Sequence, residues 1–265
     1  LLPLSGSLAR VGQAVRDGLM AAYYAAPEPR PALRFYDVGE QGHNALSAYQ
    51  RAVDEEAQFV IGPLTKQSLA VLATRGELPV PVLALNTLND RSGAPERFYQ
   101  FGLAPEDDAR AAAEFALTQG WRRTLTLVPE NQWGQRIARA YGESFERDSG
   151  IVLETGYYDP QASDYGDDIK PLLNLDASKR RYRQLRGALK LDLQFEVRRR
   201  QDVDAIFIAG FPQQARLLRP QLRFHRAVDV PVIATSHSYT GSADADADRD
   251  LDGLIVMDIP WLLQS

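Results

Sequence analysis

The 265-residue sequence contains no cysteine and only three histidines, and these two shortages exclude several kinds of chemistry. Without cysteine the chain has no disulfide bonds, thiolate zinc sites, iron–sulfur clusters or cysteine nucleophiles. The histidines, His43, His225 and His237, lie far apart and lack the i, i+4 spacing of a zinc site on a helix. We therefore expect neither a metal centre nor a cofactor.

The sequence also lacks the motifs of the common enzyme classes. It has no G-x-S-x-G elbow, P-loop, G-x-G-x-x-G fingerprint or kinase motif, and no two carboxylates stand out as an acid–base pair. It has no helix-turn-helix segment, and its net charge of −5 does not supply the basic surface that nucleic-acid binding needs. We predict a protein that has no catalytic residue and binds no nucleic acid.

Long apolar runs are missing as well. No stretch reaches the roughly 18 apolar residues of a membrane-spanning helix, and no signal peptide is visible. The chain begins with Leu-Leu-Pro-Leu, which is typical of the middle of a strand. We therefore expect the sequence to be a fragment whose targeting signal lies outside it.

What the sequence does contain is a regular alternation of short apolar runs and amphipathic stretches. The runs are rich in Val, Ile, Leu and Phe on consecutive positions, as in strands that are covered on both faces. The expected strands are 1–4, 33–38, 59–62, 80–85, 124–128, 152–157, 205–209, 230–234 and 253–257. The expected helices are 8–25, 45–56, 65–74, 106–119, 135–147 and 213–224. This order predicts an α/β fold of parallel sheets flanked by helices.

Two places in the chain resemble crossings between lobes. Near residues 101–105 a strand-like run enters a new helix, and a second crossing is expected at Thr235-Ser236. We predict a first lobe formed by residues 1–104 together with 235–265, and a second lobe formed by residues 105–234.

The stretch 174–202 interrupts the alternation. A basic helical pattern changes here to strict alternation of apolar and other residues, which predicts a helix followed by an extended segment. The alternating residues are Leu189, Leu191, Leu193, Phe195 and Val197. Residues 178–202 hold nine basic and three acidic side chains, a charge of +6, whereas the rest of the chain holds 21 basic and 32 acidic side chains, a charge of −11.

The basic helical part of this insertion is a candidate docking surface for an acidic partner or for phosphate. Its basic residues are Lys179, Arg180, Arg181, Arg183 and Arg186. The alternative is a solvated helix whose Tyr182, Leu185 and Leu189 pack inward.

A second group of candidates follows the expected strands. Ligands of open α/β sheets bind beyond the carboxyl ends of strands, where helix N-termini present free N–H groups. The residues at these positions are Ser5, Gly6, Gly62, Pro63, Thr65, Asn86 and Thr87, and Trp133 lies next to a helix end where it could line a cleft. Together they could hold a carboxylate or a similar small group. Alternatively the glycines only form turns, Thr65 only caps its helix, and Trp133 belongs to the core.

An acidic run near the end of the sequence resembles half of a calcium site. Residues 248–255, Asp-Arg-Asp-Leu-Asp-Gly-Leu-Ile, match the first eight positions of an EF-hand loop. The twelfth position, which should be a bidentate Glu, is Ile259. We therefore expect a solvated acidic loop here, with calcium binding as the alternative.

Several segments resemble type I periplasmic binding proteins, and together they cover most of the chain. They include Leu-Pro-Leu-Ser-Gly at 2–6, Gly-Gln-Ala-Val-Arg-Asp-Gly at 12–18, Phe-Val-Ile-Gly-Pro at 59–63, Pro-Val-Leu-Ala-Leu-Asn at 81–86 and Pro-Glu-Asn-Gln-Trp-Gly at 129–134. The resemblance implies a two-lobed fold of that type.

Three further segments resemble a narrower group, the LpoA (LppC) family of penicillin-binding protein activators. They are Ile-Lys-Pro-Leu-Leu-Asn at 169–174 with Ser-Lys-Arg-Arg at 178–181, Arg-Arg-Arg-Gln-Asp-Val-Asp-Ala-Ile-Phe at 198–207, and Asp-Ile-Pro-Trp-Leu-Leu at 258–263. The insertion at about 174–202 is also similar to that family and absent from ordinary amino-acid receptors.

The family resemblance implies a function. Such proteins are lipid-anchored in the outer membrane and face the periplasm, and their C-terminal domain docks on a bifunctional class A peptidoglycan synthase and stimulates its cross-linking activity. The chain would be that C-terminal domain, a non-enzymatic activator whose only link to the membrane is a lipid anchor outside this sequence. The alternative is a periplasmic solute receptor that binds an amino acid or a cell-wall peptide between its lobes. A DNA-binding regulator of the same fold is a third alternative.

Overall fold

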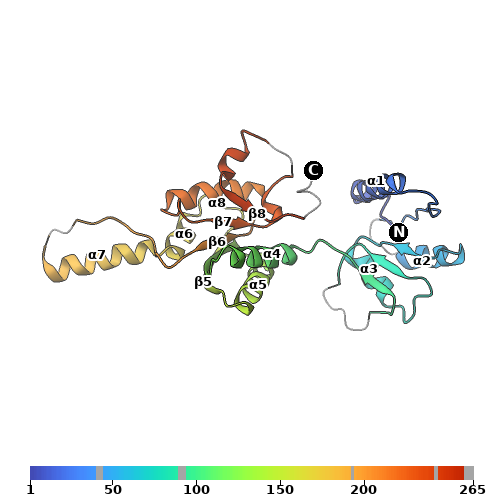
Figure 1. The fold of residues 1–265 in the computed structure, drawn as a ribbon, viewed down its shortest axis with the longest axis horizontal. Coiled ribbons are helices and arrows are strands. Elements are labelled where there is room, and N and C mark those ends of the chain that lie inside the picture. The colour runs from blue at the N-terminus through green and yellow to red at the C-terminus, as the bar shows by residue number, and fades with distance from the viewer. Residues whose placement is uncertain (40–43, 89–93, 192–193, 242–243, 260–265) are drawn as a thin grey trace. The chain divides into compact units, whose positions relative to one another are not determined.

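The computed structural model describes residues 1–39, 44–88, 94–191, 194–241 and 244–259. The chain forms two compact units, one of residues Leu1–Ala104 and one that begins at Pro105 (Figure 1). The boundary after Ala104 lies at the first of the two expected crossings. His43, Leu193 and residues 260–263 of the segment that resembles the LpoA family lie outside the described residues.

Unit 1 is built on a parallel sheet in the order β1-β2-β3. Its elements are α1 (Ala9–Ala25), α2 (Ala45–Asp54), β1 (Val60–Ile61), α3 (Lys66–Ala73), β2 (Val82–Ala84) and β3 (Phe98–Gln100). The first residues of the chain extend this sheet, because the Leu1 nitrogen donates to the Ile61 carbonyl at 2.7 Å and Leu2 forms a parallel bridge with Asp37. The strands expected at 1–4 and 33–38 are thus reduced to a single bridge.

Unit 2 contains a five-stranded parallel sheet in the order β5-β4-β6-β7-β8. Its helices are α4 (Pro105–Thr118), α5 (Gln132–Arg147), α6 (Gly166–Leu172), α7 (Leu175–Leu189) and α8 (Pro212–Phe224), with short 3₁₀ turns η1 (Ser236–Ser238) and η2 (Asp248–Leu251). Its strands are β4 (Arg123–Pro129), β5 (Ile151–Tyr158), β6 (Ala205–Ile208), β7 (Val232–Ala234) and β8 (Leu254–Val256).

Both faces of this sheet are covered, which explains why its central strands are apolar on consecutive positions. In β6, Ala205 and Phe207 pack in one core cluster with α4 and α5, while Ile206 and Ile208 pack in another with α6 and α8. Figure 1 shows the two pairs of helices on opposite sides of the sheet. The expected parallel sheets flanked by helices are confirmed. None of the helices described is long and apolar enough to cross a membrane.

The last described strand corrects one sequence-based expectation. We expected residues from 235 onward to return to the first lobe, but β8 pairs in parallel with β7, Val232 opposite Leu254 and Ala234 opposite Val256. Met257 continues the pairing, since its nitrogen donates to the Ala234 carbonyl at 2.8 Å. Pairing with β8 satisfies the backbone groups along that edge of β7, and β8 therefore belongs to the sheet of unit 2.

Candidate functional site

The loops at the carboxyl end of the unit 1 sheet bring several of the sequence-predicted residues together. Gly62 and Pro63 follow β1, and Asn86 and Thr87 follow β2. The Asn86 side chain joins the two loops, because its Nδ2 donates to the Leu64 carbonyl at 2.9 Å while its Oδ1 accepts from the Thr87 nitrogen at 2.9 Å. The amide of Asn86 is thus used within the protein to hold these loops in place.

Thr65 has the capping role that the alternative interpretation gave it. Its Oγ1 accepts from the Ser68 nitrogen at 3.2 Å at the start of α3 and lies 2.7 Å from the Ser68 hydroxyl. Its hydroxyl is therefore engaged by the first turn of α3.

Ser5 and Gly6, which follow the first extended segment, lie beside a carboxylate that sequence reasoning did not single out. Asp37 accepts hydrogen bonds from the Leu4 nitrogen at 2.8 Å, from the Gly39 nitrogen at 2.9 Å and from Ser5. Burial alone would raise the pKa of Asp37, but these hydrogen bonds outweigh it and lower the pKa below its usual value. Asp37 is thus ionised and orders the loop that carries Ser5.

Trp133 belongs to unit 2, where it is part of an aromatic cluster at the carboxyl end of the sheet. Its ring stacks on that of Phe211, with centroids 5.3 Å apart and planes 18° apart. The ring of His237 lies 5.7 Å from Trp133 and 6.0 Å from Phe211. We call these three residues the aromatic cluster. Phe211 follows β6, His237 follows β7 and Trp133 is near the start of α5, so one edge of the sheet positions all three.

A partly buried carboxylate supports the aromatic cluster. Asp108, in the first turn of α4, accepts hydrogen bonds from the nitrogen and the hydroxyl of Ser236 and lies 3.7 Å from Nδ1 of His237. Burial would raise the pKa of Asp108, but the hydrogen bonds from His237 and Ser236 lower it below its usual value. Asp108 is therefore a fixed negative charge that orients His237.

The sequence analysis did not bring Phe211, Ser236, His237 and Asp108 together. It treated His237 as one of three isolated histidines, and it treated Ser236 as part of a crossing between lobes. The available signal was their position, since Phe211, Ser236 and His237 follow strands by two or three residues. The same rule that selected Asn86 would have selected them.

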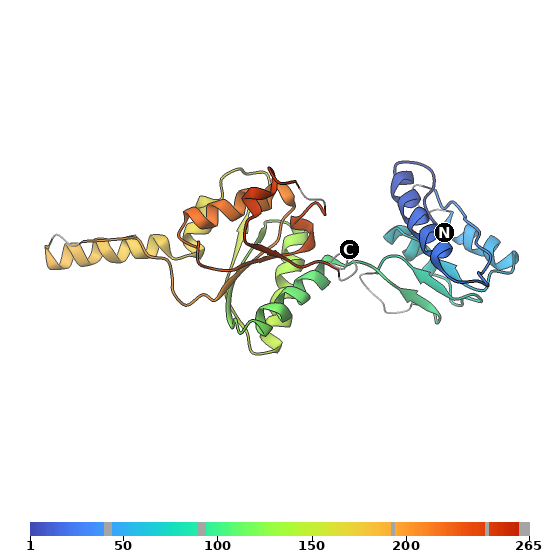
Figure 2. The ribbon, with the colours of Figure 1, turned by 45° about the horizontal axis from the view of Figure 1, so that its top comes forward.

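The basic residues of the insertion lie on a projecting element. α7 extends away from the body of unit 2, and the chain returns beside it, as Figures 1 and 2 both show. We call α7 together with residues 190–191 and 194–199 the arm. The arm is held together by the stack of Tyr182 on Phe195, with centroids 4.2 Å apart, and by a hydrogen bond of 3.3 Å from the Arg198 nitrogen to Ser178 Oγ.

Several apolar side chains of the arm are exposed to solvent. Leu185, Leu189 and Leu191 are 54%, 53% and 59% exposed. The alternative interpretation, in which Tyr182, Leu185 and Leu189 pack inward, is therefore wrong for the two leucines, whereas Tyr182 stacks on Phe195. The returning segment contacts α7 through the stack of Phe195 on Tyr182, and Leu185 and Leu189 lie beyond that stack, towards the C-terminal end of the helix.

All five predicted docking residues on α7 are exposed. Lys179 lies 3.9 Å from Asp176 on the preceding turn, an exposed pair that contributes little stability. The guanidinium groups of the other four form no ion pair with any residue that the structure describes. These four are Arg180, Arg181, Arg183 and Arg186.

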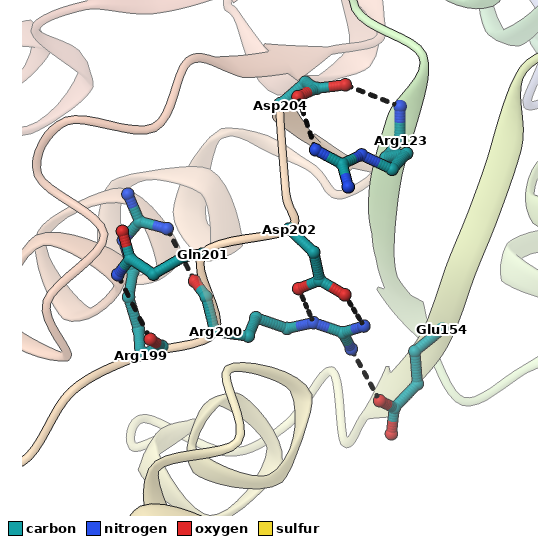
Figure 3. A network of polar contacts seen from close by, with 7 residues as sticks. All are labelled: Arg123, Glu154, Arg199, Arg200, Gln201, Asp202 and Asp204. Atoms are coloured by element: carbon teal, nitrogen blue, oxygen red, sulfur yellow. Dashed lines mark hydrogen bonds and ion pairs between the residues drawn. The ribbon is translucent and has the colours of Figure 1, made fainter.

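The base of the arm is fixed by a network of arginine–carboxylate contacts (Figure 3). Arg200 is 13% exposed and binds Asp202 through two hydrogen bonds of 2.8 and 2.9 Å, while its Nη1 contacts Glu154 of β5 at 3.3 Å. Two-point contacts of this kind are the strongest ion pairs between side chains. They lower the pKa of Asp202 to about 2.

Two further contacts complete the base. Arg199 pairs with Asp229 at 2.6 Å, and the Arg200 nitrogen donates to the Leu173 carbonyl at 3.0 Å. Asp204, just before β6, accepts from the backbone nitrogens of Arg122 and Arg123 at 2.9 and 2.8 Å. The point where the arm leaves unit 2 is therefore tied to β4 and β5.

The calcium-like acidic run forms hydrogen bonds within its own loop. Asp244 accepts from the nitrogens of Asp246 and Ala247, and Asp248 accepts from the Asp244 nitrogen and pairs with Arg216 at 3.2 Å. Among the described residues, no group of three or more histidine, aspartate or glutamate side chains is arranged to hold a metal ion.

The geometry defines a class of protein. Two units with parallel sheets, each with polar or aromatic residues at the carboxyl edge, form a two-lobed fold like that of the periplasmic binding proteins. Comparison with protein families then gives the group: the chain belongs to the family described as LppC putative lipoprotein, whose model matches residues 1–265. The resemblance seen in the sequence is thereby confirmed.

Individual relatives agree with this assignment. The chain is 28% identical, over 99% of its own length and 44% of the relative's, to the "Penicillin-binding protein activator LpoA" of Vibrio antiquarius (strain Ex25). It thus spans less than half of the curated relatives it matches. Among solved structures, the LpoA (YraM) C-domain from Haemophilus influenzae has a TM-score of 0.69 at 23% identity and covers 98% of this chain and 72% of that one.

A solved structure with another description has the same fold. The "putative branched-chain amino acid ABC transporter" from Chromobacterium violaceum ATCC 12472 has a TM-score of 0.70 at 27% identity, over 98% of this chain and 73% of that one. The fold therefore occurs in proteins described as activators and in proteins described as transporters, and function has to be argued from surfaces.

Proposed function

We propose that this chain is the docking domain of a non-enzymatic activator of a class A penicillin-binding protein, the bifunctional peptidoglycan synthase. It would act in the periplasm, within a protein attached to the outer membrane by a lipid anchor. Family membership and the names of the relatives support this role, as does the description of the Haemophilus influenzae C-domain as "a regulator of PBP1A".

The observation that carries the proposal is the arm. An ordinary solute receptor has no need of a projecting helix, whereas a docking domain needs a surface that reaches a partner. The proposed docking residues are Lys179, Arg180, Arg181, Arg183 and Arg186. Four of these side chains lack a carboxylate partner among the described residues, so an acidic partner surface would supply the missing charges.

The test is a binding and activity assay with the class A synthase of the same organism. The intact protein should bind the synthase and raise its cross-linking rate. Replacing the five docking residues by Gln should weaken binding by about tenfold or more. As a control, Arg139→Gln with Arg147→Gln removes exposed charges from α5 and should leave binding within about twofold. An intact protein that neither binds the synthase nor changes cross-linking would disprove the proposed function.

A second function, solute binding, is favoured by the aromatic cluster. Trp133 and Phe211 offer stacked rings beside His237 and the charge of Asp108, an arrangement that suits an amino acid or a cell-wall peptide. In unit 1, Ser5, Gly6, Gly62, Pro63, Thr65, Asn86 and Thr87 remain the proposed ligand residues.

This second function has its own test. A ligand at about 100 times its dissociation constant should stabilise the protein by about 2.7 kcal/mol, and a thermal-shift screen with amino acids and muropeptides would detect it. Phe211→Ala should abolish the shift, whereas Phe224→Ala, at an exposed ring on the far end of α8, should preserve it. If no compound raises the melting temperature, the cluster has only a structural role.

A further inference from the structure

One face of α7 carries an apolar seam that is only partly covered. Leu175, Ser178, Tyr182, Leu185 and Leu189 are spaced by three or four residues and therefore lie on one side of the helix. Leu175 and Ser178 are buried, and Tyr182 stacks on Phe195. The last two positions have no such cover and are more than half exposed.

A row of basic side chains runs beside this seam. Lys179, Arg183, Arg186 and Lys190 are also spaced by three or four residues, so they form a line along the flank of the leucines. Arg180 lies on the side of the helix opposite the seam, since it is two residues from Tyr182 and five from Leu185. The last turns of the arm therefore have an apolar centre with a charged border.

The arm holds this surface in a fixed place. The Arg200–Asp202–Glu154 contacts and the Arg199–Asp229 pair join its base to the body of unit 2. The stack of Tyr182 on Phe195 joins its two halves further out. A pre-ordered surface loses little conformational entropy on binding, which favours a tight complex.

We propose that Leu185 and Leu189 insert into an apolar depression on an acidic protein surface, while the adjacent basic row guides the approach. This proposal rests on the proposed function, because it takes the class A synthase as the partner. The two sets of side chains then have different roles. The leucines determine the dissociation rate of the complex, and the basic row determines its association rate.

The chemistry favours a protein over a lipid surface. Four of the five basic residues within α7 are arginines, whose planar groups bind carboxylates through two hydrogen bonds. A helix that lies in a membrane interface presents a broad apolar face with Trp or Phe. On α7 the leucines that are more than half exposed are Leu185 and Leu189, and the rings of Tyr182 and Phe195 stack on each other.

The experiment measures association and dissociation rates of the intact protein on immobilised class A synthase. Leu185→Gln with Leu189→Gln should raise the dissociation rate by about tenfold and leave the association rate within about twofold. Arg186→Gln should slow association by about threefold at low salt, with a smaller difference at high salt. Because all three residues are exposed, the variants should keep the melting temperature of the parent.

Matched controls separate this proposal from general effects. Ile151→Gln with Val228→Gln replaces two exposed apolar residues elsewhere on unit 2, 54% and 67% exposed, and should leave both rates unchanged. Arg139→Gln removes the same charge as Arg186→Gln from the exposed surface of α5, outside the docking residues, and should slow association by less than about twofold.

Several results would overturn the inference. If the parent binds the synthase and the leucine variant binds equally well, the arm is not the anchor although the proposed function stands. The proposal also fails if the leucine variant loses binding only to phosphatidylglycerol vesicles, or if it dissociates a dimer seen in sedimentation, since the occupant would then be a membrane or a second copy. If the parent does not bind the synthase, the inference and the proposed function fall together.

Discussion

The ring of Tyr182 lies nearly flat on the ring of Phe195, with centroids 4.2 Å apart and planes 13° apart. Tyr182 belongs to α7 and Phe195 to the segment that returns beside it, which is not part of any strand. A strand would be held by a ladder of backbone hydrogen bonds. Here the ring stack holds the returning segment against α7 instead. The two halves of the arm therefore depend on a small number of side-chain contacts.

Removing the stack should loosen the returning segment without unfolding unit 2. A stacked aromatic pair contributes about 0.5–1.5 kcal/mol beyond the area it buries. In Tyr182→Ala we expect the amides of residues 194–199 to exchange with deuterium faster, while those of β4 and β6 keep their protection. Leu185→Ala, one turn further along the same face, serves as the control. Unchanged exchange in residues 194–199 would contradict the role given to the stack.

The Arg200–Asp202 pair at the base of the arm should make stability depend on pH. Asp202 has a pKa of about 2 in the folded protein, against a usual value of 3.8. A lowered pKa stabilises the folded state above the usual value, and the stabilisation disappears as the pH falls towards 2. The free energy of unfolding of Asp202→Asn should thus lie below that of the parent at about pH 6, with the gap narrowing below about pH 4.

Urea unfolding at several pH values would measure that gap. Asp246→Asn, at a carboxylate that is 96% exposed, should show almost no difference from the parent at any pH. A gap for Asp202→Asn that stays constant between about pH 6 and pH 3 would mean that the pair contributes nothing through its charge.

The sequence predicts a strand best where both faces of that strand are buried, because burial then requires an apolar residue at every position. The central strand β6 was expected at 205–209 and occupies Ala205–Ile208, because a strand covered on both faces has to be apolar at every position. The strand β3, Phe98–Gln100, was not expected as a separate strand. Phe98 is buried but Tyr99 is 58% exposed, so this short strand has no apolar run to reveal it.

The same contrast holds for the functional surfaces. The positive charge of the arm and the helical spacing of its apolar residues can be seen in the sequence, because these residues lie close together in the chain. The aromatic cluster combines Trp133, Phe211 and His237 with Asp108, from four parts of the chain, and no spacing relates them. The contact between Arg200 and Glu154 likewise joins residues 46 positions apart. Such long-range contacts follow from the order of strands in the sheet, which the sequence pattern leaves undetermined.

Gly62, one of the proposed ligand residues, should be intolerant of any side chain. Its φ of +96° is unfavourable for other residues, and a Cβ atom there would lie 2.1 Å from the Leu1 carbonyl oxygen. Gly62→Ala should therefore destabilise unit 1 by about 3 kcal/mol or more. Gly120 separates the two causes, because its φ is +79° but nothing lies within 4 Å of an added Cβ. Gly120→Ala should cost only about 1 kcal/mol, and equal losses in the two variants would contradict the close contact at Gly62.

The buried hydroxyl of Tyr49 in unit 1 should contribute more to the free energy of unfolding than the buried hydroxyl of Tyr141 in unit 2. The Tyr49 hydroxyl donates to the Val80 carbonyl at 2.8 Å and accepts from the Val80 nitrogen at 3.1 Å, in a fully buried position. Tyr49→Phe leaves both backbone groups of Val80 without a partner, at a cost of about 2–4 kcal/mol. The Tyr141 hydroxyl makes one contact of 3.3 Å with Thr124, and burial raises its pKa to about 12.

Tyr141→Phe should therefore cost about 1 kcal/mol or less, because it removes a weak hydrogen bond together with a poorly solvated polar group. Both variants keep the aromatic ring, so the packing of each core is unchanged. Urea unfolding followed by hydrogen exchange assigns each loss to its unit, and Tyr49→Phe should lower the protection of β2 amides in unit 1. A larger loss for Tyr141→Phe than for Tyr49→Phe would show that these hydroxyls stabilise the protein by something other than their hydrogen bonds.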